Sequence, residues 1–156
     1  MKIVNLTSVF IYTNMQHLFV YGSLLFPELV TALTGKSFGY MPAILNGFKR
    51  YRIKGCDYPA IVEESGAKVE GYLIENVDEK SLQILTFFEG EEYKKRQVVV
   101  SGSKERINTI IFVWVGKKEL LEERDWDKFE FKQKSLKDYL EKVVPETKAA
   151  FRAINL

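Results

Sequence analysis

The sequence has little of the two side chains that most often hold transition metals in proteins. Its 156 residues contain one cysteine, Cys56, and one histidine, His17. A single cysteine excludes an intramolecular disulfide, and this pair alone cannot supply the ligands of a zinc or iron centre. We therefore expect no metal and no cofactor, and nothing in the composition requires an oxidising compartment.

A strong charge imbalance and a long apolar run are also missing. The 23 Lys and Arg residues and 21 Asp and Glu residues leave a formal net charge of +2, which gives no broad positive field for a phosphate backbone. The apolar stretch 3–12 is interrupted by Asn5, Thr7 and Ser8 and is too short and polar to span a membrane. We expect a cytoplasmic protein without a nucleic-acid or membrane partner, and a monomer is favoured.

The chain does contain enough apolar material for one folded domain. Its hydrophobic share of 46% is typical of globular proteins, and its aromatic share of 13% favours a strand-rich interior. The length suits one domain better than two. Because Met15 directly precedes the first strong strand pattern, residues 1–16 are predicted to be an N-terminal extension and residues 17–156 a single domain.

Glycine, proline and cap residues divide this domain into short elements. Pro27 and an acidic residue in the first turn predict a helix over 27–34, which Gly35 would end. Asp78 is a good N-cap for a helix that reaches about Phe88. Short apolar runs between turn residues predict strands, at 17–21, 40–46, 47–53, 59–63, 68–77, 92–101 and 106–115.

The C-terminal part is predicted to be helical. One helix should begin around Asp127 and continue until Pro145 interrupts it, and a short helix over 146–153 should follow. Many strands with a few covering helices favour a curled or closed sheet over an open, doubly wound one.

The first candidate site is the turn after the first strand. A buried strand runs into Gly22 and Ser23 immediately before the helix at 27–34. Glycine allows a ligand to approach the backbone, and unpaired N–H groups at such a turn favour anions such as a carboxylate. Taken alone, the same residues are also typical of an ordinary strand-to-helix turn.

The second candidate is Glu89. If the helix from Asp78 continues to this position, Leu82, Leu85 and Glu89 share one face. Loss of hydration beside apolar side chains and the negative end of the helix dipole would both raise the pKa of the carboxyl toward the range of a general base. The alternative is an exposed glutamate that continues a solvated acidic patch with Glu91 and Glu92.

Other polar residues are weaker candidates. Cys56 has no neighbouring histidine and is more typical of an incidental thiol than of a nucleophile. Ser23 lacks a nucleophile-elbow context, and its nearest histidine, His17, lies on the same strand. Tyr93 could donate a hydrogen bond inside a pocket, but a tyrosine that opens a strand is more often a packing residue with its hydroxyl at the surface.

Four segments with suitable gaps follow one another along the chain: Phe19–Leu24, Tyr58–Val62, Val69–Leu73 and Phe87–Tyr93. In this order they resemble the γ-glutamylcyclotransferase-like family, most closely its plant avirulence-induced-protein-like (AIG2-like) subgroup. The segments Asp125–Asp127 and Leu136–Leu140 resemble the last helical part of that subgroup. The similarity covers roughly residues 18–141.

The resemblance implies an α+β fold, a small mixed β-barrel flanked by helices. It also implies cyclisation of a γ-glutamyl amine or amino acid to 5-oxoproline, without metal or cofactor, with Glu89 as the catalytic acid and base. One departure is Thr86, where the family commonly has aspartate. Backbone groups of the loop would bind the small γ-glutamyl substrate, at Val20, Tyr21, Gly22, Ser23, Leu24 and Leu25.

Two other functions stay open at this point. A non-catalytic small-ligand-binding or interaction module could keep the same fold, because fold alone does not confer activity; an exposed Glu89 outside any pocket would favour it. Single-strand nucleic-acid binding would instead use aromatic and basic residues of one strand, and the low net charge argues against it. The residues concerned are Tyr40, Phe48, Lys49, Arg50, Tyr51 and Arg52.

Overall fold

The structure, a computed structural model, describes residues 15–155. The predicted N-terminal extension lies almost entirely outside these residues. The first strand, β1 (Gln16–Val20), begins one residue before the expected start of the domain. No helix within the described residues has the length and apolar character needed to cross a bilayer.

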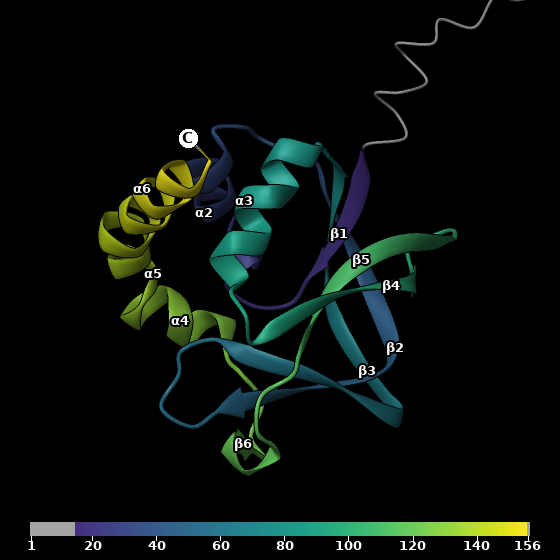
Figure 1. The fold of residues 1–156 in the computed structure, drawn as a ribbon. Coiled ribbons are helices and arrows are strands. Elements are labelled where there is room, and N and C mark those ends of the chain that lie inside the picture. Colours follow the sequence, from purple (N-terminus) through teal and green to yellow (C-terminus); the bar gives the residue numbers. More distant parts are fainter. Residues whose placement is uncertain (1–14, 156) are drawn as a thin grey trace, which may run out of the picture.

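Strands β1 to β5 close into a barrel (Figure 1). The strands follow the order β1-β3-β2-β4-β5 around the barrel, and β5 returns to β1. The β1–β5 pairing is parallel and the other pairings are antiparallel, which makes the barrel mixed and confirms the α+β prediction. The remaining bounds are β2 (Tyr40–Ile53), β3 (Pro59–Val77), β4 (Tyr93–Ser101), β5 (Arg106–Trp114) and β6 (Leu121–Glu122), which extends the sheet beside β2.

Two of the predicted strand breaks are wrong. The runs 40–46 and 47–53 form the single strand β2, and the runs 59–63 and 68–77 form the single strand β3. The register shifts between Asn46 and Phe48, where residues 64–67 of β3 stand opposite Gly47, and the two strands pair on both sides of this irregularity. Such an irregularity bends a ribbon without ending its pairing, and the long β2–β3 ribbon can therefore curl and close the barrel.

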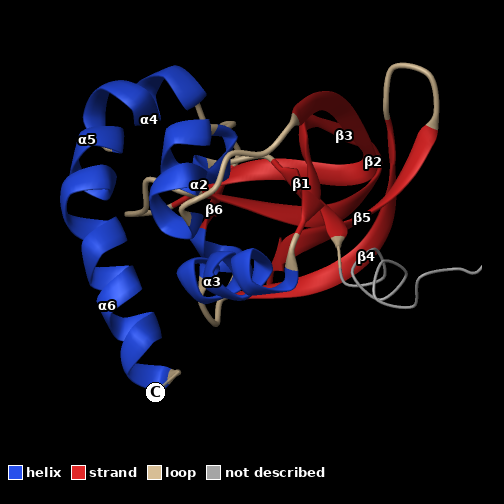
Figure 2. Cartoon of the chain, turned by 90° about the horizontal axis from the view of Figure 1, so that it is seen from above, coloured by secondary structure: helices blue, strands red, loops and turns tan. Residues whose placement is uncertain are grey.

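The helices gather on one side of the barrel (Figure 2). The predicted helix over 27–34 is confirmed with the same bounds, and the helix at Asp78 is confirmed with its N-cap, since the Asp78 carboxylate accepts a 3.1 Å hydrogen bond from the Ser81 N–H. The helical elements are α2 (Pro27–Thr34), α3 (Glu79–Glu89), α4 (Lys128–Lys134), α5 (Leu136–Asp138), the π-helical turn η3 (Tyr139–Val143) and α6 (Val144–Ile154).

The predicted interruption at Pro145 is wrong, because helical structure continues past it. Pro145 is the second residue of α6, which directly follows the π-helical turn η3, within a helical run that is continuous from Leu136 to Ile154. The turn η3 precedes it with the wider π geometry, which leaves room for the proline ring.

Strand β1 runs between two hydrophobic cores. Leu18 and Val20 belong to the core shared with the helices, whereas Phe19 and Tyr21 belong to the core inside the barrel. This alternation follows from the period of two of a strand. The end of β1 therefore delivers the chain to the boundary between barrel and helices, where α3 also ends.

Candidate active site

The loop after β1 is held tightly against the start of β3. A Cβ atom on Gly22 would lie 2.8 Å from Cδ of Pro59, so this close approach requires glycine. The loop then forms a short 3₁₀ turn, η1 (Ser23–Leu25), which begins with a 2.9 Å hydrogen bond from the Leu25 N–H to the Gly22 carbonyl.

Several backbone donors of this loop have no acceptor. Among residues 15–155, no protein group accepts a hydrogen bond from the N–H of Gly22, Ser23 or Leu24. Successive free N–H groups at a turn form a concave donor set that suits a carboxylate or another anion. The loop thus has the free N–H groups that the predicted anion cradle would need, and anion binding there stays a prediction.

Arg50, on β2, fixes the orientation of this loop. Its Nη1 donates a 2.7 Å hydrogen bond to the Tyr21 carbonyl, while Nε and Nη2 bind the Asp125 carboxylate at 2.8 and 3.1 Å. The C=O and N–H of a trans peptide point in opposite directions. With the Tyr21 carbonyl bound to Arg50, the N–H of Gly22 in the same peptide is turned away from the guanidinium.

Glu89 is the last residue of α3. The next residue, Gly90, has a φ of 82°, which ends the helix, and its N–H donates to the Thr86 carbonyl at 3.2 Å. Leu82 and Leu85 are buried, so the predicted apolar face of this helix is confirmed. Thr86 stands where the family commonly has aspartate. Its hydroxyl donates a 2.7 Å hydrogen bond to the Leu82 carbonyl, so this side chain binds to its own helix.

The Glu89 carboxyl lies in an apolar and aromatic environment. Burial raises the pKa of this carboxyl to about 8, although the residue keeps part of its surface open. No donor within the described part of the chain forms a hydrogen bond with it. Burial first, and the charge of Glu89 second, also raise the pKa values of the Tyr21 and Tyr93 hydroxyls. The carboxyl is thus desolvated and open to a partner from a ligand.

The loop and Glu89 face one cavity, which we call the loop cavity. It has a volume of about 20 Å³, room for about one water molecule. Its wall includes Glu89, Tyr58, Tyr93 and five of the six predicted substrate-binding residues, namely Val20, Tyr21, Gly22, Ser23 and Leu24. Leu25 is not placed on this wall, because its side chain is buried in the core and its N–H is used in the turn.

A second cavity of about 220 Å³ adjoins the first, and we call it the aromatic cavity. Both cavities share four residues, Ser23, Tyr58, Glu89 and Tyr93. The wall of the aromatic cavity also includes Phe88, Tyr139 and Val143. Glu89 therefore lies at the junction of two adjoining cavities.

Two tyrosines of this region differ from the sequence expectation. The Tyr93 hydroxyl is not at the surface, because it donates a 2.6 Å hydrogen bond to the Pro59 carbonyl. Tyr139 was not predicted as a site residue, yet it lines the aromatic cavity and donates to Asp57 Oδ1 at 2.8 Å. Local pattern gives no sign of this contact, since the two residues are 82 positions apart.

The weaker candidates lie in other contacts. Nδ1 of His17 accepts a 3.2 Å hydrogen bond from the Asn76 N–H, and Glu91 and Glu92 are exposed, as predicted. Within residues 15–155, no group of three or more His, Cys, Asp or Glu side chains is arranged to hold a metal ion.

The residues considered for nucleic-acid binding have other partners. Phe48 and Tyr51 are buried, and Tyr40 donates a 3.0 Å hydrogen bond to the Leu24 carbonyl. The neighbouring cations form ion pairs, Lys49 with Glu64 and Glu123, Arg50 with Asp125, and Arg52 with Glu130.

Comparison with known proteins identifies the family. A family model described as gamma-glutamyl cyclotransferase, AIG2-like, matches residues 18–128. The chain belongs to this family. It is 33% identical over 125 residues to AIG2-like protein C of Arabidopsis thaliana, an alignment that covers 79% of this chain and 73% of that protein. The resemblance found in the sequence motifs is confirmed.

Solved structures share the fold. A solution structure of an Arabidopsis thaliana protein matches with a TM-score of 0.65 and 28% identity, covering 90% of this chain and 81% of that one. A structure described as gamma-glutamyl cyclotransferase matches with a TM-score of 0.57 and 19% identity, covering 82% of this chain and 85% of that one. At that identity, the second likeness concerns the fold alone.

Proposed function

We propose that this AIG2-like protein is a γ-glutamylcyclotransferase with Glu89 as its general base and acid. The observation that carries the proposal is that Glu89 and the loop residues Gly22, Ser23 and Leu24, whose N–H groups have no acceptor in the described chain, line one cavity, which adjoins a larger one of about 220 Å³. An amino-acid head group offers the complementary charges, a carboxylate for the N–H groups and an ammonium for Glu89.

The raised pKa of Glu89 suits the first proton transfer. Burial raises the pKa of Glu89 to about 8, and an α-amino group has an ordinary pKa of about 7.7–8.0. Transfer of a proton between groups of similar pKa requires little free energy. A glutamate with its ordinary pKa would be a much weaker base toward an ammonium group.

The reaction is a transfer of the γ-acyl group from one nitrogen to another in the same molecule. Glu89 removes a proton from the α-ammonium, and the amine forms a bond to the γ-carbonyl carbon. The free loop N–H groups that do not hold the α-carboxylate stabilise the resulting oxyanion. Glu89 then gives its proton to the leaving nitrogen as the old C–N bond breaks. The ring nitrogen passes its second proton to the Glu89 carboxylate, which releases it to solvent, and the products are 5-oxoproline and the free amine.

The protein needs few chemical groups for this step because attacker and target are already connected. Holding the γ-glutamyl chain in its folded, ring-forming conformer supplies the orientation, and intramolecular reactions of this kind reach effective molarities of about 10⁵–10⁸ M. One carboxylate can serve both proton transfers.

The test is release of 5-oxoproline by the purified chain from a panel of γ-glutamyl amines, γ-glutamyl amino acids and glutathione. The proposal expects release from at least one panel member. The Glu89→Gln substitution should remove most of the 5-oxoproline release. The Glu91→Gln substitution, which changes an exposed neighbour, should leave the release unchanged. A folded protein that binds panel members without turnover would instead support the non-catalytic module.

A further inference from the structure

We propose that a groove on the outer face of the β2–β3 ribbon is a second ligand site, which binds a small amphipathic carboxylate, an acid with an aromatic or aliphatic body. The groove, which we call the ribbon groove, has a volume of about 510 Å³, within the range of about 300–1,000 Å³ typical of small-molecule sites. Among the described residues, its wall shares none with the loop cavity or the aromatic cavity. The inference therefore does not depend on the proposed cyclotransferase activity.

The floor of the ribbon groove comes from two neighbouring cross-strand pairs. Pro42 stands opposite Tyr72, and Ile44 stands opposite Glu70. Ala43, between the two β2 residues, belongs to the core inside the barrel, so the period of two of a strand turns its neighbours and their cross-strand partners to the outer face. Tyr72 keeps 37% of its surface exposed. The floor thus offers mainly apolar and aromatic area that a ligand could bury.

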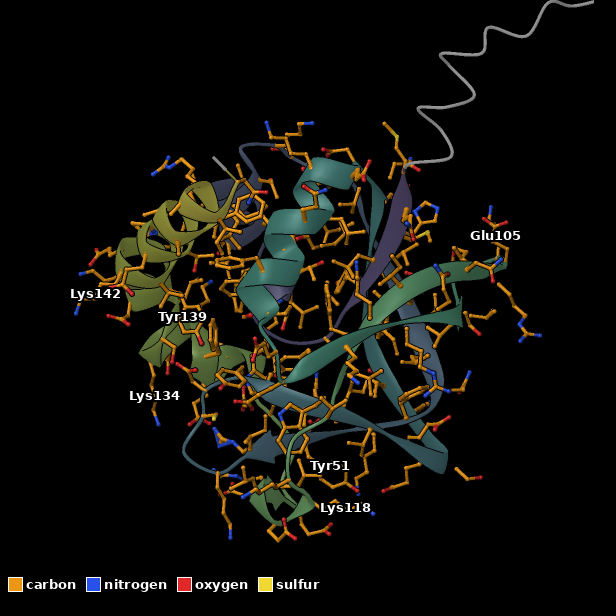
Figure 3. The ribbon with its side chains drawn as sticks, viewed as in Figure 1. Tyr51, Glu105, Lys118, Lys134, Tyr139 and Lys142 are labelled. Atoms are coloured by element: carbon orange, nitrogen blue, oxygen red, sulfur yellow. The ribbon has the colours of Figure 1, made fainter. Side chains whose placement is uncertain are left out.

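Two further parts of the fold form the walls of the groove. One wall is the β4–β5 turn, which is closed by a 2.8 Å hydrogen bond from the Gly102 N–H to the Glu105 carbonyl. Figure 3 shows Glu105 on the opposite side of the molecule from Tyr139 of the helical layer. The other wall comes from η1 and the start of α4, which contribute Leu25 and Lys128. The groove therefore reaches from the β4–β5 turn to the edge of the helical layer.

Lys128 is a cation of this wall without a carboxylate partner. Within residues 15–155 it forms no ion pair, whereas Lys134 of the same helix binds Glu130 at 3.2 Å. Its Nζ lies 5.3 Å from the centroid of the Phe26 ring and 5.8 Å from the centroid of the Tyr72 ring. The ammonium group is thus held over aromatic faces at the edge of the apolar floor, where a ligand carboxylate would supply the missing counter-charge.

Arg50 also lines the ribbon groove and has donors to spare. A guanidinium carries five N–H groups, and Nε, Nη1 and Nη2 each use one of them for the Asp125 carboxylate or the Tyr21 carbonyl. Nη1 and Nη2 thus each keep one N–H that no described residue accepts. Since the same guanidinium orients the loop after β1, a ligand bound to it would contact the group that positions the proposed active site.

Glu70 gives the ligand its direction. It is the carboxylate among the described residues of the groove wall, and it lies two residues along β3 from Tyr72, over which the Lys128 ammonium is placed. Like charge disfavours an anion beside Glu70, whereas Lys128 and Arg50 attract one. The acid group is therefore expected at the helical side of the groove, with the apolar body over Ile44 toward the β4–β5 turn.

A titration of the whole chain with 4-phenylbutyrate, followed by the amide NMR signals of the labelled protein, tests the site. We expect saturable binding with signal shifts at Gly71, Gly102 and Ser103, which line the groove. The neutral 4-phenylbutyramide has the same size without the charge. It should bind about fivefold more weakly, the factor that one exposed ion pair produces.

Variants of the groove charges should move the affinity for 4-phenylbutyrate in opposite directions. Lys128→Met should weaken binding about fivefold, and Glu70→Gln should tighten it about twofold to fivefold because it removes a like charge. Lys132→Met is the matched control, since Lys132 belongs to the same helix but does not line the groove. All three positions are exposed, and thermal unfolding checks that the variants fold. An equal loss in Lys132→Met would overturn the role of Lys128.

Several results of the titration would overturn the carboxylate site. Absence of saturable binding, or equal affinity for the acid and its amide, would do so. Signal shifts confined to Gly22 and Ser23 would place the acid in the loop cavity instead. Binding of an acidic peptide at the groove without binding of 4-phenylbutyrate would assign the surface to a protein partner. Release of 5-oxoproline bears on Glu89 alone, so the two proposals can fail separately.

Discussion

Arg50 binds the backbone carbonyl of Tyr21 through Nη1 at a distance of 2.7 Å. The guanidinium is itself fixed by a bidentate contact with Asp125 and lies over the Trp126 ring, 5.4 Å from its centroid. A residue far from the loop in sequence thereby determines the direction of the Gly22 N–H, one of the donors in the proposed carboxylate cradle.

Replacement of Arg50 should therefore weaken substrate binding more than the chemical step. We expect Arg50→Met to lower kcat/KM by about tenfold to a hundredfold, mainly through KM, because a misplaced donor costs orientation. Arg50→Lys should recover part of the loss. Arg96→Met is the control, since Arg96 also pairs with a carboxylate, Glu63, but at an exposed site; an equal loss in that variant would contradict a specific role of Arg50.

The close approach of Gly22 to Pro59 predicts a steric effect. Gly22→Ala places a Cβ 2.8 Å from Pro59 Cδ, so the loop or β3 must shift, and we expect a loss of about 1–3 kcal/mol in unfolding free energy together with reduced activity. In Gly39→Ala the new Cβ meets Glu75 at an ordinary 3.6 Å. Chemical denaturation of both variants should separate them, and equal stability would show that the loop tolerates displacement.

The raised pKa of Glu89 predicts the pH dependence of turnover. The base must be deprotonated, so kcat/KM should fall as pH decreases below about 8, by up to about tenfold per pH unit. Rate measurements across this range check it. A flat profile between about pH 6 and 8 would indicate a carboxyl near its ordinary pKa.

The raised pKa of Glu89 also makes the free energy of unfolding depend on pH, in the opposite direction to the rate. Between the ordinary glutamate pKa of 4.5 and about 8, the folded protein retains a proton on Glu89 that the unfolded chain has lost. Stability should therefore decrease as pH rises through this window, with a slope of at most about 1.4 kcal/mol per pH unit from this group. Glu89→Gln should remove that component and be the more stable protein above about pH 8; parallel stability curves for the two proteins would contradict the burial of the charge.

The helices could be predicted because their end signals are local. Pro27 and Gly35 bound α2, and the Asp78 carboxylate and Gly90 bound α3, each through contacts within a few residues. Glu89 could also be placed on the apolar face of α3, since Leu82 and Leu85 fix that face through the helical period.

The closure of the barrel and several cavity residues could not be predicted in this way. The parallel β1–β5 pairing joins Leu18 to Ile110, and the Arg50–Asp125 contact spans 75 positions, so no local pattern reports either. Glycine suggested strand ends in β2 and β3, but pairing continues on both sides of the register shift at Gly47. Tyr139 reaches the site only because the helical layer packs back onto α3.

The central claim is that Glu89 moves the protons of an intramolecular cyclisation, and the Glu89→Gln variant tests it most directly. The amide keeps the size of the side chain but cannot accept the ammonium proton. We expect a folded protein whose 5-oxoproline production is about 10²- to 10⁴-fold slower than that of the unchanged chain, with a smaller change in ligand affinity. Undiminished 5-oxoproline production by the folded Gln variant would contradict the assignment of Glu89 as the base.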